Sequence, residues 1–191
     1  MTEQTKVWIV SDTHFGHTNI IKYENRPFWK KILGLNTTEP DVHLMDETLI
    51  KNWNDVVGKG DKVFHLGDFS LVPKEPTKHI LSRLNGYKIL IMGNHDMRHS
   101  ANWWKEAGFD EVSKYSIIYN QFYILSHRPI YLNENMPYIN IHGHTHKIKQ
   151  ELTNEKGNPS YINVCVENTD YKPLLFAEIT KQWEEQDSSE L

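Results

Sequence analysis

The stretch "VWIVSDTH", residues 7–14, places a carboxylate and an imidazole directly after a short apolar run. The run from Val7 to Val10 has the β-branched and aromatic composition of a buried strand. Asp12 and His14 then supply an oxygen and a nitrogen of the kinds that bind metal ions. A short β-type run followed by a metal-ligating residue type returns four more times along the chain, and this pattern indicates both the fold and the site.

Five β-type runs each end in a small residue and then a metal-ligating residue type. The runs span residues 6–10, 62–66, 88–92, 121–125 and 138–141. The side chains that follow them are, in order, Asp12 and His14; Asp68; Asn94, His95 and Asp96; His127; and His142, His144 and His146. In open α/β sheets, sites form beyond the carboxyl ends of the strands. We therefore expect these side chains to meet in one crevice.

Helical patterns lie between the first runs and set the fold class. From Val42 to Val56 the apolar residues follow a 3.6-residue period, with Thr38 or Asp41 available as the N-cap. Shorter helical patterns occupy residues 75–86 and 100–109, and two further β-type runs cover 161–167 and 174–179. Strands that alternate with helices predict an α/β layer structure with the sheet in the middle.

One domain over residues 1–183 is expected, followed by a disordered acidic tail over residues 184–191. Residues 18–40 form a mixed segment, and its role as a lid or as a wall of the site stays open. The oligomeric state stays open as well.

Composition limits the classes of partner. The net charge is −4, which gives no basic footprint for nucleic-acid binding. The first residues lack a signal-peptide pattern, and no apolar window is long enough for a membrane span. We expect a cytoplasmic protein without a membrane partner. Cys165 is the single cysteine, and its apolar neighbours predict a small buried side chain.

A mixed set of imidazole, carboxylate and amide ligands without a cysteine favours Mn²⁺, Fe or Zn²⁺, with Ni²⁺ and Co²⁺ as further options. Taken singly, each short motif is weak, because an Asp-x-His or a Gly-Asp pair occurs often in ordinary turns. All five motifs in this order, each at a strand end, indicate a metal site.

In this order the motifs resemble those of the calcineurin-like metallophosphoesterases. The family pattern is D-x-H, then G-D, then G-N-H-(D/E), then H, then G-H-x-H, and this chain has every element between residues 7 and 170. The stretch "SDTHFGHTNII" is similar to a subgroup of small bacterial and phage phosphoesterases. The resemblance implies a four-layer α-β-β-α sandwich that carries two divalent transition-metal ions, with Mn²⁺ favoured.

The resemblance also implies a role for each motif residue. One metal ion would be held by Asp12, His14 and His146, the other by Asn94, His127 and His144, and Asp68 would bridge the two. His95 would face the substrate as a catalytic residue, and Asp96 would orient it by accepting from its other ring nitrogen. His142 precedes the motif and is expected to be a neighbouring buried imidazole.

The implied activity is hydrolysis of a phosphodiester or nucleotide-like phosphate ester by in-line attack of a metal-bridging hydroxide. A phosphomonoesterase, a nucleotide pyrophosphohydrolase and a non-catalytic metal-binding scaffold remain alternatives. The substrate partner would be a small phosphate ester such as a nucleotide. His17, Asn19 and Arg128 are the candidate substrate-binding residues, since they follow ligand motifs closely. Arg26 and Arg98 are weaker candidates for binding phosphate.

Overall fold

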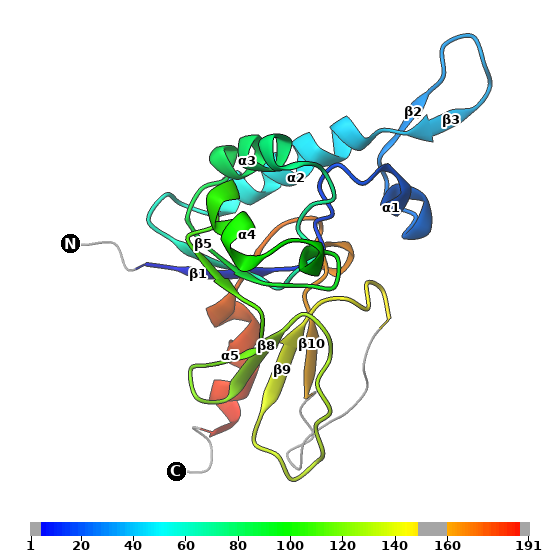
Figure 1. Cartoon of the computed structure of the whole chain (residues 1–191). Coiled ribbons are helices and arrows are strands. Elements are labelled where there is room, and N and C mark those ends of the chain that lie inside the picture. Colours follow the sequence, from blue (N-terminus) through cyan, green and yellow to red (C-terminus); the bar gives the residue numbers. More distant parts are fainter. Residues whose placement is uncertain (1–4, 149–159, 188–191) are drawn as a thin grey trace.

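The computed structural model describes residues 5–148 and 160–187, and Figure 1 shows their arrangement. A five-stranded sheet has the strand order β11-β1-β4-β5-β6. Its strands are β1 (Val7–Val10), β4 (Lys62–His65), β5 (Tyr87–Ile91), β6 (Glu111–Ser113) and β11 (Leu174–Leu175). The first four are parallel and β11 is antiparallel to β1. The carboxyl ends of β1, β4 and β5 therefore lie at one edge.

A second, four-stranded sheet has the order β10-β9-β8-β7. It is built from β7 (Ile117–Tyr119), β8 (Tyr123–Ser126), β9 (Ile139–His142) and β10 (Tyr161–Asn163). Strands β8, β9 and β10 are parallel, and β7 is antiparallel to β8. The carboxyl ends of β8 and β9 are thus also neighbours.

Helices cover one face of the five-stranded sheet. They are α2 (Val42–Val56), α3 (Lys74–Arg83) and α4 (Ala101–Ala107). Asp41 caps α2 by accepting from the backbone N–H of Leu44, and Ser100 caps α4 in the same way. Trp53 and Trp104 are fully buried in the core beneath these helices.

A second core lies between the two sheets, as the alternation of side chains along the strands requires. Trp8 and Val10 of β1 face the helices, whereas Ile9 faces the second sheet. Ile9 shares this second core with Leu125 of β8 and Ile141 of β9. The protein therefore has helices, a mixed sheet and a second sheet in successive layers, and the expected α/β class is confirmed (Figure 1).

The C-terminal segment differs from expectation. Residues 174–179 were expected to form a strand, but only Leu174–Leu175 is extended, and helix α5 runs from Phe176 to Asp187. Phe176 and Ile179 lie three residues apart and both pack into the second core, which a helix allows and a strand does not. Residues 184–187 of the expected disordered tail are therefore helical, and residues 188–191 lie outside the described part. The run expected over 161–167 is a strand only to Asn163, followed by a 3₁₀ turn, η2 (Val166–Asn168).

Residues 18–40 form helix α1 (Thr18–Tyr23) and a hairpin of β2 (Trp29–Lys31) and β3 (Thr38–Pro40). The hairpin extends away from both sheets in Figure 1. In the described ranges no helix is long and apolar enough to cross a membrane.

Replacing Ile141 by alanine should cost roughly 2–5 kcal/mol of the free energy of unfolding, because its side chain is fully buried between the sheets. Ile118 of β7 is 60% exposed and is the matched control, for which the same substitution should cost less than about 0.5 kcal/mol. Urea denaturation measures both. Equal losses would contradict the two-sheet core.

Candidate metal centre

The loops after β1 and β4 are joined by backbone hydrogen bonds beyond the ends of the strands. The N–H of Asp12 donates to the carbonyl of Gly67 at 3.0 Å, and the N–H of His14 donates to that of Asp68 at 3.0 Å. This pairing brings the first motif beside the second. A further bond from Gly143 to the carbonyl of His127, also 3.0 Å, joins the loops after β8 and β9.

Five of the expected ligands have left-handed backbone conformations. The φ angles are 60° at Asp12, 51° at His14, 55° at Asp68, 68° at His144 and 47° at His146. Such a conformation costs a non-glycine residue on the order of 1–3 kcal/mol and clusters at functional sites. The sharp turns aim successive side chains at one point, which an extended strand with period-two alternation would not do.

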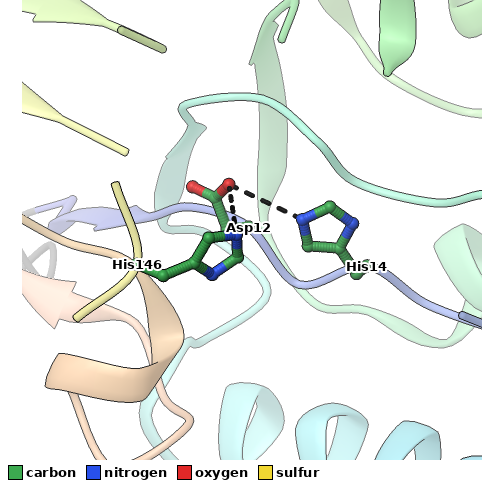
Figure 2. A group of neighbouring side chains, drawn as sticks. All are labelled: Asp12, His14 and His146. Carbon is green, nitrogen blue, oxygen red and sulfur yellow. Dashed lines mark ion pairs between the residues drawn. The ribbon is translucent and has the colours of Figure 1, made fainter. Parts of the chain in front are cut away.

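The first ligand group consists of Asp12, His14 and His146, whose ligand atoms all lie within 4.8 Å of one another. The Nε2 atoms of His14 and His146 lie 3.7 Å and 3.9 Å from Oδ1 of Asp12 (Figure 2). Among the described residues, that Oδ1 and both ring nitrogens of His14 are buried without a hydrogen-bond partner. Buried polar atoms are rarely left unpaired, so this group fits a bound cation.

The other oxygen of Asp12 is fully engaged. Oδ2 accepts from Ser11 Oγ at 2.5 Å, from the His144 N–H at 2.9 Å and from Cys165 Sγ at 3.3 Å. Burial alone would raise the pKa of Asp12. The interactions with His14 and the charges of nearby histidines lower it by a larger amount, so the pKa of Asp12 lies below its usual value. Asp12 is therefore an ionised carboxylate with one oxygen held and one oxygen free.

The second ligand group consists of Asp68, His127 and His144. Nε2 of His127 lies 3.5 Å from Oδ2 of Asp68. The same Oδ2 lies 3.8 Å from Nε2 of His14, which belongs to the first group. Asp68 thus faces both groups, in the position expected of a bridging carboxylate.

His127 is oriented by a backbone carbonyl. Its Nδ1 lies 2.8 Å from the carbonyl oxygen of Leu66, which can only accept, so Nδ1 carries the hydrogen and Nε2 has its lone pair free. Nε2 lies 2.9 Å from Oδ1 of Asn94. The amide oxygen and the ring nitrogen can both present lone pairs to one cation. Asn94 therefore lies beside the second group, and its expected role as a ligand stays a prediction.

His95 borders both groups and is partly open to solvent. Its backbone N–H donates to Oδ1 of Asp68 at 2.9 Å, and its ring Nε2 lies 3.8 Å from Oδ2. The ring is 5.4 Å from that of His14. Burial, partly offset by the charge of Asp68, holds the pKa of His95 below its usual value.

The expected role of Asp96 was wrong in its contacts. No hydrogen bond among the described residues joins its carboxylate to the His95 ring. Instead Oδ2 accepts from the backbone N–H groups of Asp68 and Gly93 at 2.7 Å and 2.8 Å, and Oδ1 accepts from that of Phe69 at 3.1 Å. Burial raises the pKa of Asp96 to about 6. Asp96 therefore holds the turn that carries Asp68, and it does not orient His95.

The three candidate substrate-binding residues differ in placement. The His17 ring lies 5.7 Å from that of His14, and burial, together with the charge of His14, lowers the pKa of His17 to about 4. Arg128 is exposed, and its charge contributes to the lowered pKa of His144, for which burial is the larger cause. Asn19 is exposed on α1, and its side chain makes no hydrogen bond in the part of the chain described. The structure thus gives contacts or charge effects that connect His17 and Arg128 to the ligands and gives none for Asn19.

Two other buried histidines lie outside both ligand groups. His142, the last residue of β9, is buried, is not part of either ligand group, and has Nδ1 2.8 Å from the carbonyl of Gly143. His65 is buried, with Nε2 3.0 Å from Oγ1 of Thr13. His142 was expected to be a neighbouring buried imidazole; it is buried as expected, and its role beside the ligands stays a prediction.

The sequence analysis did not predict the buried pair of Glu167 and Arg26, which contacts the expected ligands. Glu167 lies 3.0 Å from Nδ1 of His146, and Arg26 donates to Glu167 and to the carbonyls of Asp12 and Thr13. Glu167 follows the apolar run 161–166, just as the ligands follow their strands, and that position was an available signal. Arg26 carried no such signal; it was considered as a surface charge or a weak candidate for binding phosphate, and its full burial contradicts both interpretations.

The backbone at Gly143 packs closely against Ser11 and Asp12. A Cβ atom there would lie 2.0 Å from Ser11 Oγ and 2.3 Å from Asp12 Oδ2. Gly143→Ala should therefore displace Asp12 and weaken the binding of Mn²⁺, used as a probe ion, by about tenfold or more. Calorimetric titration measures the affinity. Gly60→Ala is the control, since no atom lies within 4 Å of its added Cβ; unchanged binding in both variants would contradict the assigned geometry.

Comparison with known proteins gives relatives without a described activity. No protein-family model matches the sequence. The chain is 38% identical over 184 residues to the uncharacterized protein MJ1445 of Methanocaldococcus jannaschii, covering 92% of this chain and 90% of that protein. It is 36% identical over 101 residues to the Gene 66 protein of Mycobacterium phage L5, covering 51% of this chain and 43% of that one.

A solved structure has the same fold over nearly the whole chain. It is the crystal structure of the protein of unknown function AQ665 from Aquifex aeolicus, with a TM-score of 0.68 and 28% identity, covering 94% of this chain and all of that one. The high identity to MJ1445 extends over almost the full length of both chains. The chain therefore belongs to the family of the Methanocaldococcus jannaschii protein MJ1445.

Proposed function

We propose that the protein is a dinuclear metal-dependent phosphoesterase of the calcineurin-like metallophosphoesterase type. The observation that carries the proposal is the pair of ligand groups on either side of Asp68, with buried, unpartnered ligand atoms at Asp12 and His14. Isolated metal-like clusters are common on protein surfaces. Two largely buried groups that share a facing carboxylate fit a two-metal phosphoryl-transfer site.

The order of the motifs supports the same proposal. Each of the five motifs follows a strand, and the loops are joined across the two sheets. The three observed layers of helices, sheet and sheet are consistent with the first three layers of a four-layer α-β-β-α sandwich, and α5 is the helix available for the fourth. Mn²⁺ is the favoured ion, because the donors are imidazole, carboxylate and amide groups.

Bound divalent ions would supply positive charge to the phosphate and activate a water molecule near neutral pH. Asp12 and Asp68 provide the negative charge that holds them. His95 lies beside Asp68 and is 31% exposed, and it would give a proton to the leaving oxygen or stabilise charge on the phosphate. The exposed Arg98 and Arg128 add positive charge beside the site. After burial, this charge contributes to the lowered pKa of His95 and of His144.

The substrate class in this proposal is a phosphodiester or a nucleotide-like phosphate ester. His95 is partly exposed, and His17 and Arg128 lie beside the ligands. A phosphomonoesterase or a nucleotide pyrophosphohydrolase would use the same ligands. Relative rates on mono- and diester substrates separate these possibilities.

Purified protein loaded with Mn²⁺ should hydrolyse bis(p-nitrophenyl) phosphate, and a chelator should abolish the activity. Absorbance of released nitrophenolate measures the rate, with p-nitrophenyl phosphate as the monoester comparison. If the metal-loaded protein hydrolyses no ester in a broad panel yet binds the ions, a metal-binding scaffold becomes the better reading.

His95→Ala should keep metal affinity and lose turnover by roughly 10²–10⁴-fold, since the ring is placed for proton transfer and its backbone contact to Asp68 survives the change. Asp68→Ala is the contrasting variant and should lose both turnover and metal. The two readouts are kcat and the number of Mn²⁺ ions bound. Unchanged kcat in the His95 variant would remove this residue from the mechanism.

A further inference from the structure

Arg26 is fully buried, and its guanidinium uses every donor it has. Nε and Nη2 donate to Oε1 of Glu167 at 2.8 Å and 2.6 Å, and Nη2 also donates to the carbonyl of Asp12 at 2.8 Å. Nη1 donates to the carbonyl of Thr13 at 3.0 Å and to Sδ of Met45 at 3.4 Å. Five contacts match the five N–H groups of a guanidinium. Arg26 therefore has no donor left for a substrate.

Glu167 connects this guanidinium to a ligand. Its side chain is fully buried, and the same Oε1 that accepts from Arg26 lies 3.0 Å from Nδ1 of His146. A carboxylate that is ionised only accepts, so Nδ1 of His146 carries the hydrogen. Its Nε2 then faces Oδ1 of Asp12 at 3.9 Å with a free lone pair.

We propose that Arg26 and Glu167 are positioning residues for the first ligand group: one buried ion pair holds the turn that carries Asp12 and His14 and also orients His146. The inference rests on the proposed metal centre. The pair contacts both chain segments that supply this group. One segment carries Asp12 and His14, and the other, more than 130 residues later, carries His146.

The pair serves one ligand group and not the other. In the second group, the ring of His127 is oriented by the backbone carbonyl of Leu66, which no side-chain substitution removes. The hydrogen-bond partners of metal-ligating histidines fix the tautomer and raise the affinity for the metal. Loss of Glu167 should therefore weaken the first metal equivalent and leave the second.

A buried ion pair is a costly way to stabilise a fold, because apolar residues of similar volume often do as well or better. Its retention here is explained by what it contacts: backbone carbonyls of one ligand turn and a ring nitrogen of another ligand. Lysine could not replace Arg26, since an ammonium has three donors without the planar fork that reaches Asp12, Thr13 and Glu167 together.

The test compares Glu167→Gln with Glu47→Gln. Glu47 accepts two bonds from Arg83, at 2.7 Å and 2.6 Å, on the outer helices α2 and α3, so its variant removes the same charge from an Arg–Glu pair remote from the site. Calorimetric titration of the metal-free proteins with Mn²⁺ measures each binding step, and circular dichroism checks folding. In Glu167→Gln one step should weaken about 10–100-fold while the other is unchanged. In Glu47→Gln both should be unchanged.

Unchanged affinity for both equivalents in a folded Glu167→Gln protein would overturn the inference and leave the proposed function intact. If the unsubstituted protein binds no divalent ion, the proposed function itself fails.

A measurement on the unsubstituted protein keeps the inference testable even if the variant does not fold. Nitrogen-15 NMR of the histidine rings should show His146 as the Nδ1–H tautomer, with that proton slow to exchange. The Nε2–H tautomer at His146 would overturn the proposed role of Glu167.

Discussion

The site depends on a parallel strand pairing that continues past the strands. β1 and β4 are in register from Val7 to Val10, and the two loops that follow stay joined through the carbonyls of Gly67 and Asp68. This contact is made by backbone atoms and does not depend on the side chains. It therefore places Asp12 and His14 next to Asp68. The second sheet supplies the remaining imidazoles only because its strands β8 and β9 end at the same level, with Gly143 against Ser11 and Asp12.

The buried side chains around the site carry more negative than positive charge. Asp12, Asp68, Asp96 and Glu167 all have buried side chains, and Arg26 is the buried guanidinium among them. Unpaired charge is costly in a low-dielectric interior. Asp96 relieves part of the cost by its raised pKa and its three backbone donors. The proposed divalent ions would relieve the rest, in a chain whose net charge of −4 offers no general positive surface.

The ligands were predictable because they depend on order along the chain. A strand places the next residue at a sheet edge, so the meeting of Asp12, His127 and His144 could be predicted from apolar runs and the residues after them, whereas their roles as ligands rest on the resemblance. Arg26 and Glu167, which contact the expected ligands, do not follow this order. Arg26 lies between α1 and β2, and its contacts with Glu167 form only in the folded chain, because the two residues are far apart in sequence. The helix at Phe176 escaped prediction because a six-residue apolar run fits either period, and packing against the second core decided it.

The left-handed turns also restrict how the centre could be re-engineered for another ion. Exchanging His14, His144 or His146 for a thiolate or a longer carboxylate would place a new side chain on a backbone that few residue types tolerate. Branched replacements there are excluded outright by crowding at Cβ. His127 has an ordinary backbone and is held by a carbonyl partner. It is therefore the position at which a designer could alter the donor set, and hence the ion preference, without first redesigning the main chain.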